Sequence, residues 1–260
     1  MGNSPLRFTV LQKDSAIQAL IQAERIDHYL EECYDDLPNS LARLNYSYHP
    51  NRVSSTIYYT NAFNQIVSKI PKQLHSAGEV AIVVLMPSAD GGMPHTRPPN
   101  IICYPDLSGI LHSGVITNSF VRTLIHELCH VHQRKFPAMW ATIFEAIGWI
   151  PWRGELPTRL DNYRRYNPDT IDSPLWIHGE WVPIPVFKDG TKPVLSEVEI
   201  WFYHKTDGYH VKSVPEDIYI EGLPASAYEH PREITAYMIS EPERYVGTSE
   251  YAIIKKYVDI

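Results

Sequence analysis

The amino-acid sequence predicts an α+β fold, with a mixed sheet in the N-terminal half and a mostly helical C-terminal half that contains an inserted antiparallel β meander. The continuous β-branched run at 80–85 is typical of a strand buried on both faces of a sheet. Apolar residues recur at helical spacing before and after this run, which predicts helices that pack on the sheet. Runs rich in Trp, Val and Ile between about 175 and 214, separated by Asp-Gly turns, predict the meander.

Length and composition fit a globular protein. The 260 residues suit a single domain built from two subdomains, which we expect at 1–136 and 137–260. The net charge of −7 argues against a nucleic-acid partner, because a protein that binds nucleic acid needs a basic surface. A local basic group is expected to anchor a loop or to lie on a solvated face; its members are Arg153, Arg159, Arg164 and Arg165.

The sequence also bears on the cellular compartment. Its 3 cysteines match neither a disulfide framework nor a thiolate zinc site, which favours a reducing environment. The N-terminus has no basic segment followed by an apolar one, so no secretory signal is expected. The longest apolar run, at 80–86, is too short to cross a bilayer. We therefore expect a cytoplasmic protein with no membrane partner.

Helical and extended segments alternate in the first third of the chain. The first helix is expected to begin at Ser15, because Ser15 and Gln18 are spaced as a capping box, and to end at Pro38. The segment 44–59 mixes Tyr, Val, Ser and Thr, which favours a strand or an extended connection. A second helix is expected at 63–70.

A short strand is expected at Ile101–Tyr104, after a Gly- and Pro-rich loop at 90–99. Prolines at the start of a strand favour an edge position, because proline has no N–H group for the ladder. The predicted mixed sheet therefore has its edge strand just before the helix that carries the main motif of the chain.

That motif is His-Glu-x-x-His, at 126–130, in a helix that should begin near Thr117 and run to about Arg134. His126 and His130 are one turn apart on one helix face, so both imidazoles can bind one metal ion. Glu127 is rotated by about 100°, which suits a general base that acts on a metal-activated water. His132 is expected at the surface.

Further elements follow in the C-terminal half. Pro137 can open a helix that Gly148 ends. The segment 149–174 has no clear period and predicts an ordered loop. Two last helices are expected at about 231–240 and 249–257.

A hydrolytic zinc site needs a third protein ligand and an open position for water. The metzincin pattern would place Gly and His three and six residues after His130, where this chain has Gln133 and Phe136. The third ligand must therefore come from another element. Glu145 is a polar residue inside an apolar helical pattern that suggests burial, and Glu233 lies early in the helix at 231–240.

The segment 123–131 resembles the active-site helix of the zincin metallopeptidases. The segment 230–237 resembles the second zinc-binding helix of gluzincins, in which a Glu is followed three residues later by a small residue, here Glu233 and Ala236. The resemblance favours Glu233 as the third ligand. Tyr237 follows Glu233 by one turn and can orient it through a hydrogen bond, or it can be a core aromatic.

The resemblance implies a gluzincin-type zinc endopeptidase of zincin-like fold, with a peptide or protein substrate and one Zn²⁺ ion. His126, His130 and Glu233 would bind the zinc, and Glu127 would transfer protons. Zincins use a Tyr or His across the cleft to stabilise the oxyanion, often shortly before the ligand Glu, and Tyr228 occupies such a position.

Further residues are candidates for substrate contacts. Tyr219 and His210 are the next candidates for the oxyanion donor if Tyr228 does not serve. The edge strand of zincins aligns an extended peptide by strand addition, so residues of the preceding loop either line the cleft or are ordinary loop residues; they are His95, Thr96 and Arg97. Two alternatives remain, a zinc-dependent hydrolase of a non-peptide amide and a non-catalytic structural or interaction protein with a vestigial motif.

Overall fold

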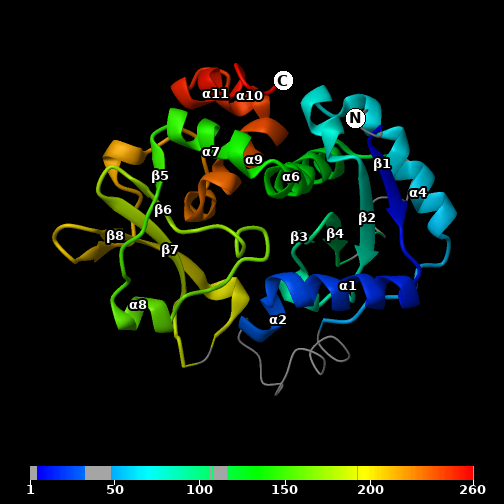
Figure 1. Cartoon of the computed structure of the whole chain (residues 1–260), viewed down its shortest axis with the longest axis horizontal. Helices are drawn as coiled ribbons and strands as arrows, with labels where there is room; N and C mark the ends of the chain where they lie inside the picture. Colours follow the sequence, from blue (N-terminus) through cyan, green and yellow to red (C-terminus); the bar gives the residue numbers. More distant parts are fainter. Residues whose placement is uncertain (1–4, 33–47, 106, 108–115, 192, 260) are drawn as a thin grey trace. The chain divides into compact units, whose positions relative to one another are not determined.

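The computed structural model of the chain describes residues 5–32, 48–105, 107, 116–191 and 193–259. The chain separates into two compact units, which we call unit 1 (residues 1–135 and the last two residues) and unit 2 (residues 136–258). Each unit has its own sheet, one mixed and one antiparallel (Figure 1). The predicted α+β class is therefore confirmed.

The sheet of unit 1 has the strand order β1-β2-β4-β3. Its strands are β1 (Arg7–Val10), β2 (Glu79–Val84), β3 (His95–Arg97) and β4 (Ile101–Tyr104). β2 is parallel to β1 and β4, whereas β3 is antiparallel to β4, so the sheet is mixed as predicted. β2 lies between two strands, which confirms the predicted central strand. β1 was not predicted.

The prediction that Ile101–Tyr104 forms an edge strand is wrong. This strand, β4, is paired on both sides, and the outer strand of the described sheet is β3, in a segment predicted to be a loop. Pro98 and Pro99 lie in the turn between β3 and β4, outside both strands. Their missing N–H groups therefore remove no ladder hydrogen bond, and they carry no information about the edge.

A helix covers the opposite edge of the sheet, which is formed by β1. α4 (Thr56–Gln65) lies along β1, as Figure 1 shows. The β1 N–H groups of Phe8 and Val10 donate to the side chains of Asn64 and Thr60 at 3.0 and 2.9 Å. Helix side chains thus satisfy strand donors that would otherwise be exposed at an edge.

Helix starts in unit 1 differ from the predictions. The predicted capping box is wrong, because α1 (Lys13–Asp27) begins before Ser15 and its N-cap, Gln12, makes no side-chain cap hydrogen bond. Residues 56–59, predicted to be extended, are helical because the Ser55 side chain accepts the Tyr58 N–H and caps α4. Pro38 and residues 44–47 lie outside the described residues. The other helices in the described part of unit 1 are α2 (Tyr29–Glu32), η1 (Val67–Lys69), η2 (Lys72–Ala77), η3 (Ala89–Gly92) and α6 (Asn118–Lys135).

The sheet of unit 2 is the predicted antiparallel meander, with one additional strand at its start. Its order is β5 (Trp149–Pro151), β6 (Trp176–His178), β7 (Trp181–Phe187), β8 (Val198–His204) and β9 (His210–Val211). β5 and the short helix α8 (Thr158–Asn162) lie in the segment predicted to be an ordered loop. Both are too short to show a period in the sequence.

Two prolines occupy the long strand β7. β6 pairs with β7 at Trp181, whereas Pro183 and Pro185 lie beyond this pairing. On this side of β7, the Pro185 carbonyl accepts the Arg165 N–H at 2.8 Å, and the Phe187 N–H donates to Tyr163. The prolines therefore lie on a part of β7 where no paired strand accepts a hydrogen bond from their positions. The chain around Arg165 is attached to β7 instead.

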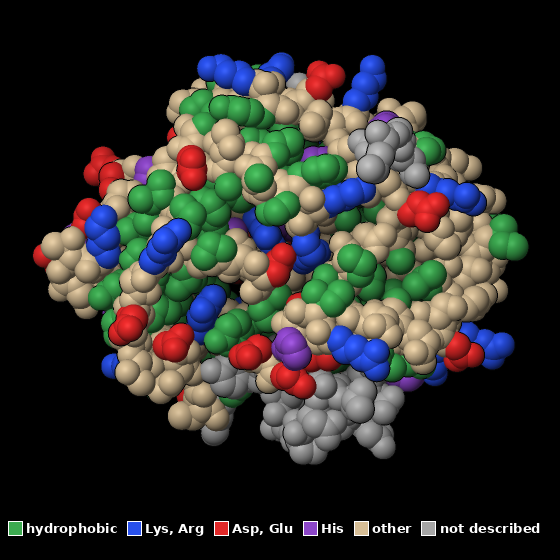
Figure 2. All heavy atoms as spheres, in the orientation of Figure 1, with side chains coloured by type: hydrophobic (Ala, Val, Ile, Leu, Met, Phe, Trp, Pro, Cys, Tyr) green, Lys and Arg blue, Asp and Glu red, His purple; other side chains and the backbone are tan. Residues whose placement is uncertain are grey.

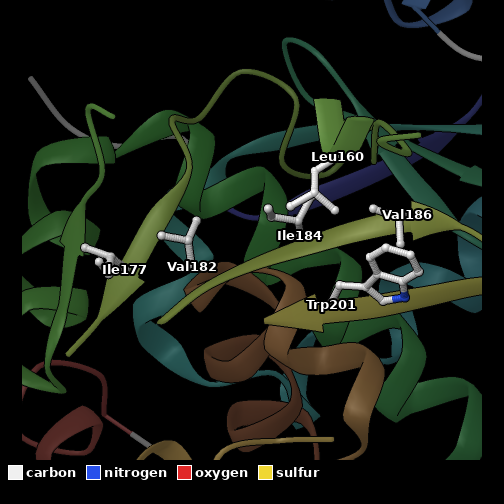
Figure 3. Packing of buried hydrophobic residues seen from close by; sticks show 6 residues of the cluster. All are labelled: Leu160, Ile177, Val182, Ile184, Val186 and Trp201. Carbon is white, nitrogen blue, oxygen red and sulfur yellow. The ribbon is translucent and has the colours of Figure 1, made fainter. Parts of the chain in front are cut away.

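One face of β7 builds the core of unit 2. Alternate residues of the strand point to the same side, as expected for a pleated strand. Figure 3 shows these side chains packed with residues of α8, β6 and β8; the cluster consists of Leu160, Ile177, Val182, Ile184, Val186 and Trp201. This core supports the segment between α8 and β6, which contributes to the site described below.

Helices of unit 2 begin largely where the prolines predict. α7 (Pro137–Ala146) and α9 (Pro231–Ser240) both start with proline, and Gly148, with φ of +91°, follows the end of α7. α11 (Ser249–Ile254) ends earlier than predicted, and α10 (Pro242–Tyr245) was not predicted. The short helices are η4 (Leu195–Glu197), η5 (Glu216–Ile218) and η6 (Ala225–Glu229).

Within the described residues, no helix combines the length and apolar character needed to cross a bilayer. Acidic and basic side chains are interspersed on the face drawn in Figure 2.

Candidate metal centre

The two histidines of the motif lie on α6 as predicted. Thr117 caps this helix, because its Oγ1 accepts the Phe120 N–H at 3.2 Å. Ring nitrogens of His126 and His130 approach within 4.8 Å, and their ring centroids are also 4.8 Å apart. Apolar residues fix the rotation of the helix by packing into unit 1; they include Leu124, Leu128 and Val131, each fully buried. The helix therefore presents two imidazoles that can share one ion.

Gln133 orients the second histidine. The Nδ1 of His130 lies 2.9 Å from the Gln133 Oε1, and both side chains are completely buried. A carbonyl oxygen only accepts, so the proton is assigned to Nδ1, which leaves Nε2 as the nitrogen with a lone pair. Metal-binding histidines are commonly held in this way. The signal in the sequence was a Gln three residues after the second His, on the same helix face.

Glu127 lies on the buried side of α6, with only 5% of its surface exposed. Burial raises the pKa of the Tyr104 hydroxyl, and the negative charge of Glu127 raises this pKa further. The same two causes raise the pKa of the Cys129 thiol. Glu127 is thus a buried acidic side chain whose charge acts on Tyr104 and Cys129.

Glu233 lies in the first turn of α9, in unit 2. His230 caps this helix through its Nδ1, which accepts the Arg232 N–H at 3.0 Å. The Glu233 side chain is 8% exposed, and its Oε1 accepts a hydrogen bond from the Asn167 Nδ2 at 3.1 Å. A buried carboxylate held by a neutral donor remains a suitable metal ligand.

A second buried carboxylate accompanies Glu233. Glu229 also accepts a hydrogen bond from the Asn167 Nδ2, and Arg165 lies 3.4 Å from its other oxygen. Burial raises the pKa of Glu229 to about 7; Arg165 opposes this shift, whereas the charge of Glu233 adds to it. The charge of Glu233 therefore acts on a second buried acidic group.

Asn167 was missed in the sequence, whereas Glu229 is there a weaker candidate for a metal ligand, expected to be a surface or structural residue. Asn167 lies in the segment predicted to be a featureless loop, and a single Asn there carries no periodic signal. Glu229 precedes Glu233 by four residues, a spacing that would have suggested proximity had the chain between them been read as one helix. Arg165 anchors a loop, one of the two roles expected for the basic group.

Tyr228 contributes to the core of unit 2. Its side chain is fully buried, and its hydroxyl accepts the Ile220 N–H at 2.6 Å and donates to the Ile220 carbonyl at 3.2 Å. Burial raises its pKa to about 12. Because the hydroxyl is engaged on the backbone, the structure offers no support for the predicted role in oxyanion stabilisation. Tyr219, by contrast, is 59% exposed.

The expectation that Glu145 is buried is wrong, because its side chain is exposed on α7 beside the buried Phe144. The packing of α7 uses the face opposite to Glu145. Tyr237 is half-buried near Glu233, whose charge, together with burial, raises the tyrosine pKa. Its hydroxyl bonds to the Ser226 side chain.

The residues expected to line a cleft, His95 to Arg97, are buried in unit 1. Arg97 pairs with Glu24 and Asp27 of α1, at 2.7 Å in each case. The His95 ring bonds to the Tyr48 hydroxyl, and Thr96 accepts a hydrogen bond from Arg134 at 3.2 Å. These contacts attach β3 to α1, to α6 and to the segment around Tyr48, so the interpretation as cleft residues is wrong.

His132 is also buried, so its predicted surface position is wrong. Its Nε2 lies 2.8 Å from the Ser76 Oγ. Burial and the charge of Lys135 lower the pKa of His132 to about 4, so its ring is neutral at physiological pH.

The donor set of two imidazoles and one carboxylate fits zinc, because catalytic zinc sites commonly use these ligand types. Comparisons with protein-family models, with curated proteins and with solved structures found no match to this chain. A function must therefore be argued from the chemistry of these side chains.

Proposed function

We propose that the chain is a zinc-dependent metallopeptidase of the gluzincin type, in which His126, His130 and Glu233 bind one zinc ion. One observation carries the proposal: ring nitrogens of His126 and His130 lie within 4.8 Å of each other on one face of α6, so both can bind one ion. Glu233 is proposed as the third ligand from the resemblance of 230–237 to the second zinc-binding helix of gluzincins. Two hydrogen bonds support it, because each orients a candidate ligand. His130 donates to the Gln133 Oε1, and the Asn167 Nδ2 donates to Glu233.

Zinc at such a site lowers the pKa of a bound water and polarises a carbonyl group. Glu127 follows the first ligand directly and is the group that takes a proton from the attacking water. The same carboxylic acid then gives this proton to the leaving amine. The buried position of Glu127 limits competition from bulk water for this proton.

Peptide substrates are proposed from the resemblance of 123–131 and 230–237 to gluzincin helices. Strand addition to Ile101–Tyr104 no longer supports them, because β4 is paired on both sides. A non-peptide amide substrate remains the second candidate for the same metal chemistry.

We expect the purified chain to bind about one zinc ion per molecule, since one three-ligand group is proposed. His126→Ala should lose most of this zinc, because two ligands hold the ion much more weakly than three. Elemental analysis after dialysis at neutral pH measures the zinc content. His28→Ala is the matched control, because His28 is an exposed histidine paired with Glu31. A wild-type chain that binds no zinc would refute the proposal.

Peptide and non-peptide substrates are separated by assay. We expect the zinc-loaded chain to cleave members of a peptide library, as detected by mass spectrometry, and to lose this activity with a chelator. Turnover of simple amides with an intact peptide library would favour the amidase. Stoichiometric zinc without turnover of either class would favour a non-catalytic protein.

A further inference from the structure

We infer that Asn167 is a positioning residue that holds the Glu233 carboxylate in place for the metal, an inference that rests on the proposed function. The Asn167 side chain is 7% exposed, and its amide nitrogen donates to both Glu229 and Glu233. One amide group has two N–H donors, so it can serve two carboxylates at once.

The amide is itself fixed in orientation. Its Oδ1 accepts the Asp169 N–H at 3.1 Å, which directs the NH₂ group away from the turn. The Asn167 carbonyl also accepts the N–H groups of Thr170 and Ile171, at 3.0 and 2.8 Å. Neither the side chain nor its backbone can therefore rotate without breaking several hydrogen bonds.

The segment that carries Asn167 is attached to the core of unit 2. The Arg165 N–H donates to Pro185 of β7 at 2.8 Å, and the Phe187 N–H donates to Tyr163 at 2.9 Å. An isolated bridge pairs Arg164 with Val186. Because Val186 belongs to the buried β7 face, the position of Asn167 is determined by the core and not by a loose loop.

The chemistry of the contacts distinguishes the two carboxylates. Arg165 lies beside Glu229, whereas the Asn167 contact to Glu233 is uncharged. A neutral donor keeps a buried carboxylate oriented and adds no positive charge that would repel a cation. The Asn167 contact engages one of the two Glu233 oxygens, Oε1.

A purely structural reading is also available, because the Oδ1 contact to Asp169 forms a turn that Asn often makes. The two interpretations differ in which side-chain group a substitute for Asn167 must keep. If only the turn matters, a residue with a short side-chain oxygen should replace Asn167. If positioning matters, the donor that reaches Glu233 must be present.

The test measures the zinc dissociation constant of the full chain by competition with a chromophoric chelator. We expect Asn167→Ala to weaken zinc binding by roughly 10- to 100-fold, as for other residues that orient a metal ligand. Asn167→Ser keeps an oxygen for the turn but is too short to bridge both carboxylates, so it should lose a similar factor. Circular dichroism of the zinc-free variants verifies that they are folded.

A double variant provides the second arm. Without Asn167, Glu229 and Glu233 repel each other and Glu233 leaves its position. Glu229→Gln removes this repulsion and supplies an amide, so it should restore part of the zinc affinity of Asn167→Ala. A structural loss in the loop would not respond to this change. Asn100→Ala is the matched control, since Asn100 donates to the Glu79 carbonyl in unit 1.

Zinc affinity within twofold of wild type in Asn167→Ala, full affinity in Asn167→Ser, or no recovery with Glu229→Gln would each overturn the role of Asn167 while the zinc site itself stands. Absence of zinc binding by the wild-type chain would overturn both the zinc site and this role.

Discussion

Glu127→Gln is expected to lower kcat by about 10²–10⁴-fold, the range for loss of a general acid–base residue. Glutamine has the size of glutamate, so it fits the buried site, but its amide cannot accept the proton of the attacking water. Zinc content should remain near one ion per chain, because Glu127 is not among the proposed ligands. The combination of retained metal and lost turnover identifies a base.

Glu145→Gln is the matched control for this experiment. Glu145 is an exposed glutamate on α7, so its substitution should change neither zinc content nor turnover. Rates are measured on a peptide identified in the library, with zinc content determined on the same samples. A Glu127→Gln variant that retains more than a tenth of wild-type kcat would remove Glu127 from the mechanism.

Arg97→Leu should destabilise unit 1 by about 3–5 kcal/mol, the usual cost of removing one partner of a buried ion pair. Arg97 has no exposed surface, and its guanidinium pairs with Glu24 and Asp27. It also lies over the rings of Tyr29 and Tyr48, at 5.1 and 5.5 Å from their centroids. Leucine replaces the stem but leaves two buried carboxylates without their cation.

The probe for this prediction must report on unit 1. All 6 tryptophans lie in unit 2, so their fluorescence does not follow the unfolding of unit 1. Cys103 and Cys129 are buried free thiols in unit 1, and their reaction with a thiol reagent in urea measures its unfolding, in a Cys33→Ser background.

Glu31→Gln is the control, because the pair of His28 and Glu31 in unit 1 is exposed and should contribute at most about 1 kcal/mol. A loss below about 1 kcal/mol in Arg97→Leu would mean that the Arg97 ion pairs contribute no more than a surface pair.

Long periodic segments were predictable from the sequence. The strand at 80–85, the helix that carries His126 and His130, the meander and the helix at Pro231 all have local patterns that tertiary contacts reinforce. Proline at the first helical position was a reliable signal in α7 and α9, because it requires no N–H partner there.

Strand order and hydrogen-bond partners were not predictable. The edge assignment of Ile101–Tyr104 failed because strand order depends on contacts with segments distant in sequence, such as the pairing with Ala81 to Val84. The partners of Tyr228, Arg97 and His132 are likewise 8 to 73 residues away. A side chain's type and local spacing do not reveal such partners.

The division of the chain into two units has a thermodynamic consequence if one ion takes ligands from both. Each unit has its own sheet, so the metal-free chain would not be obliged to unfold in one cooperative step. An ion bound only by the folded pair adds its binding free energy to both units together. The metal would then act on cooperativity as well as on chemistry.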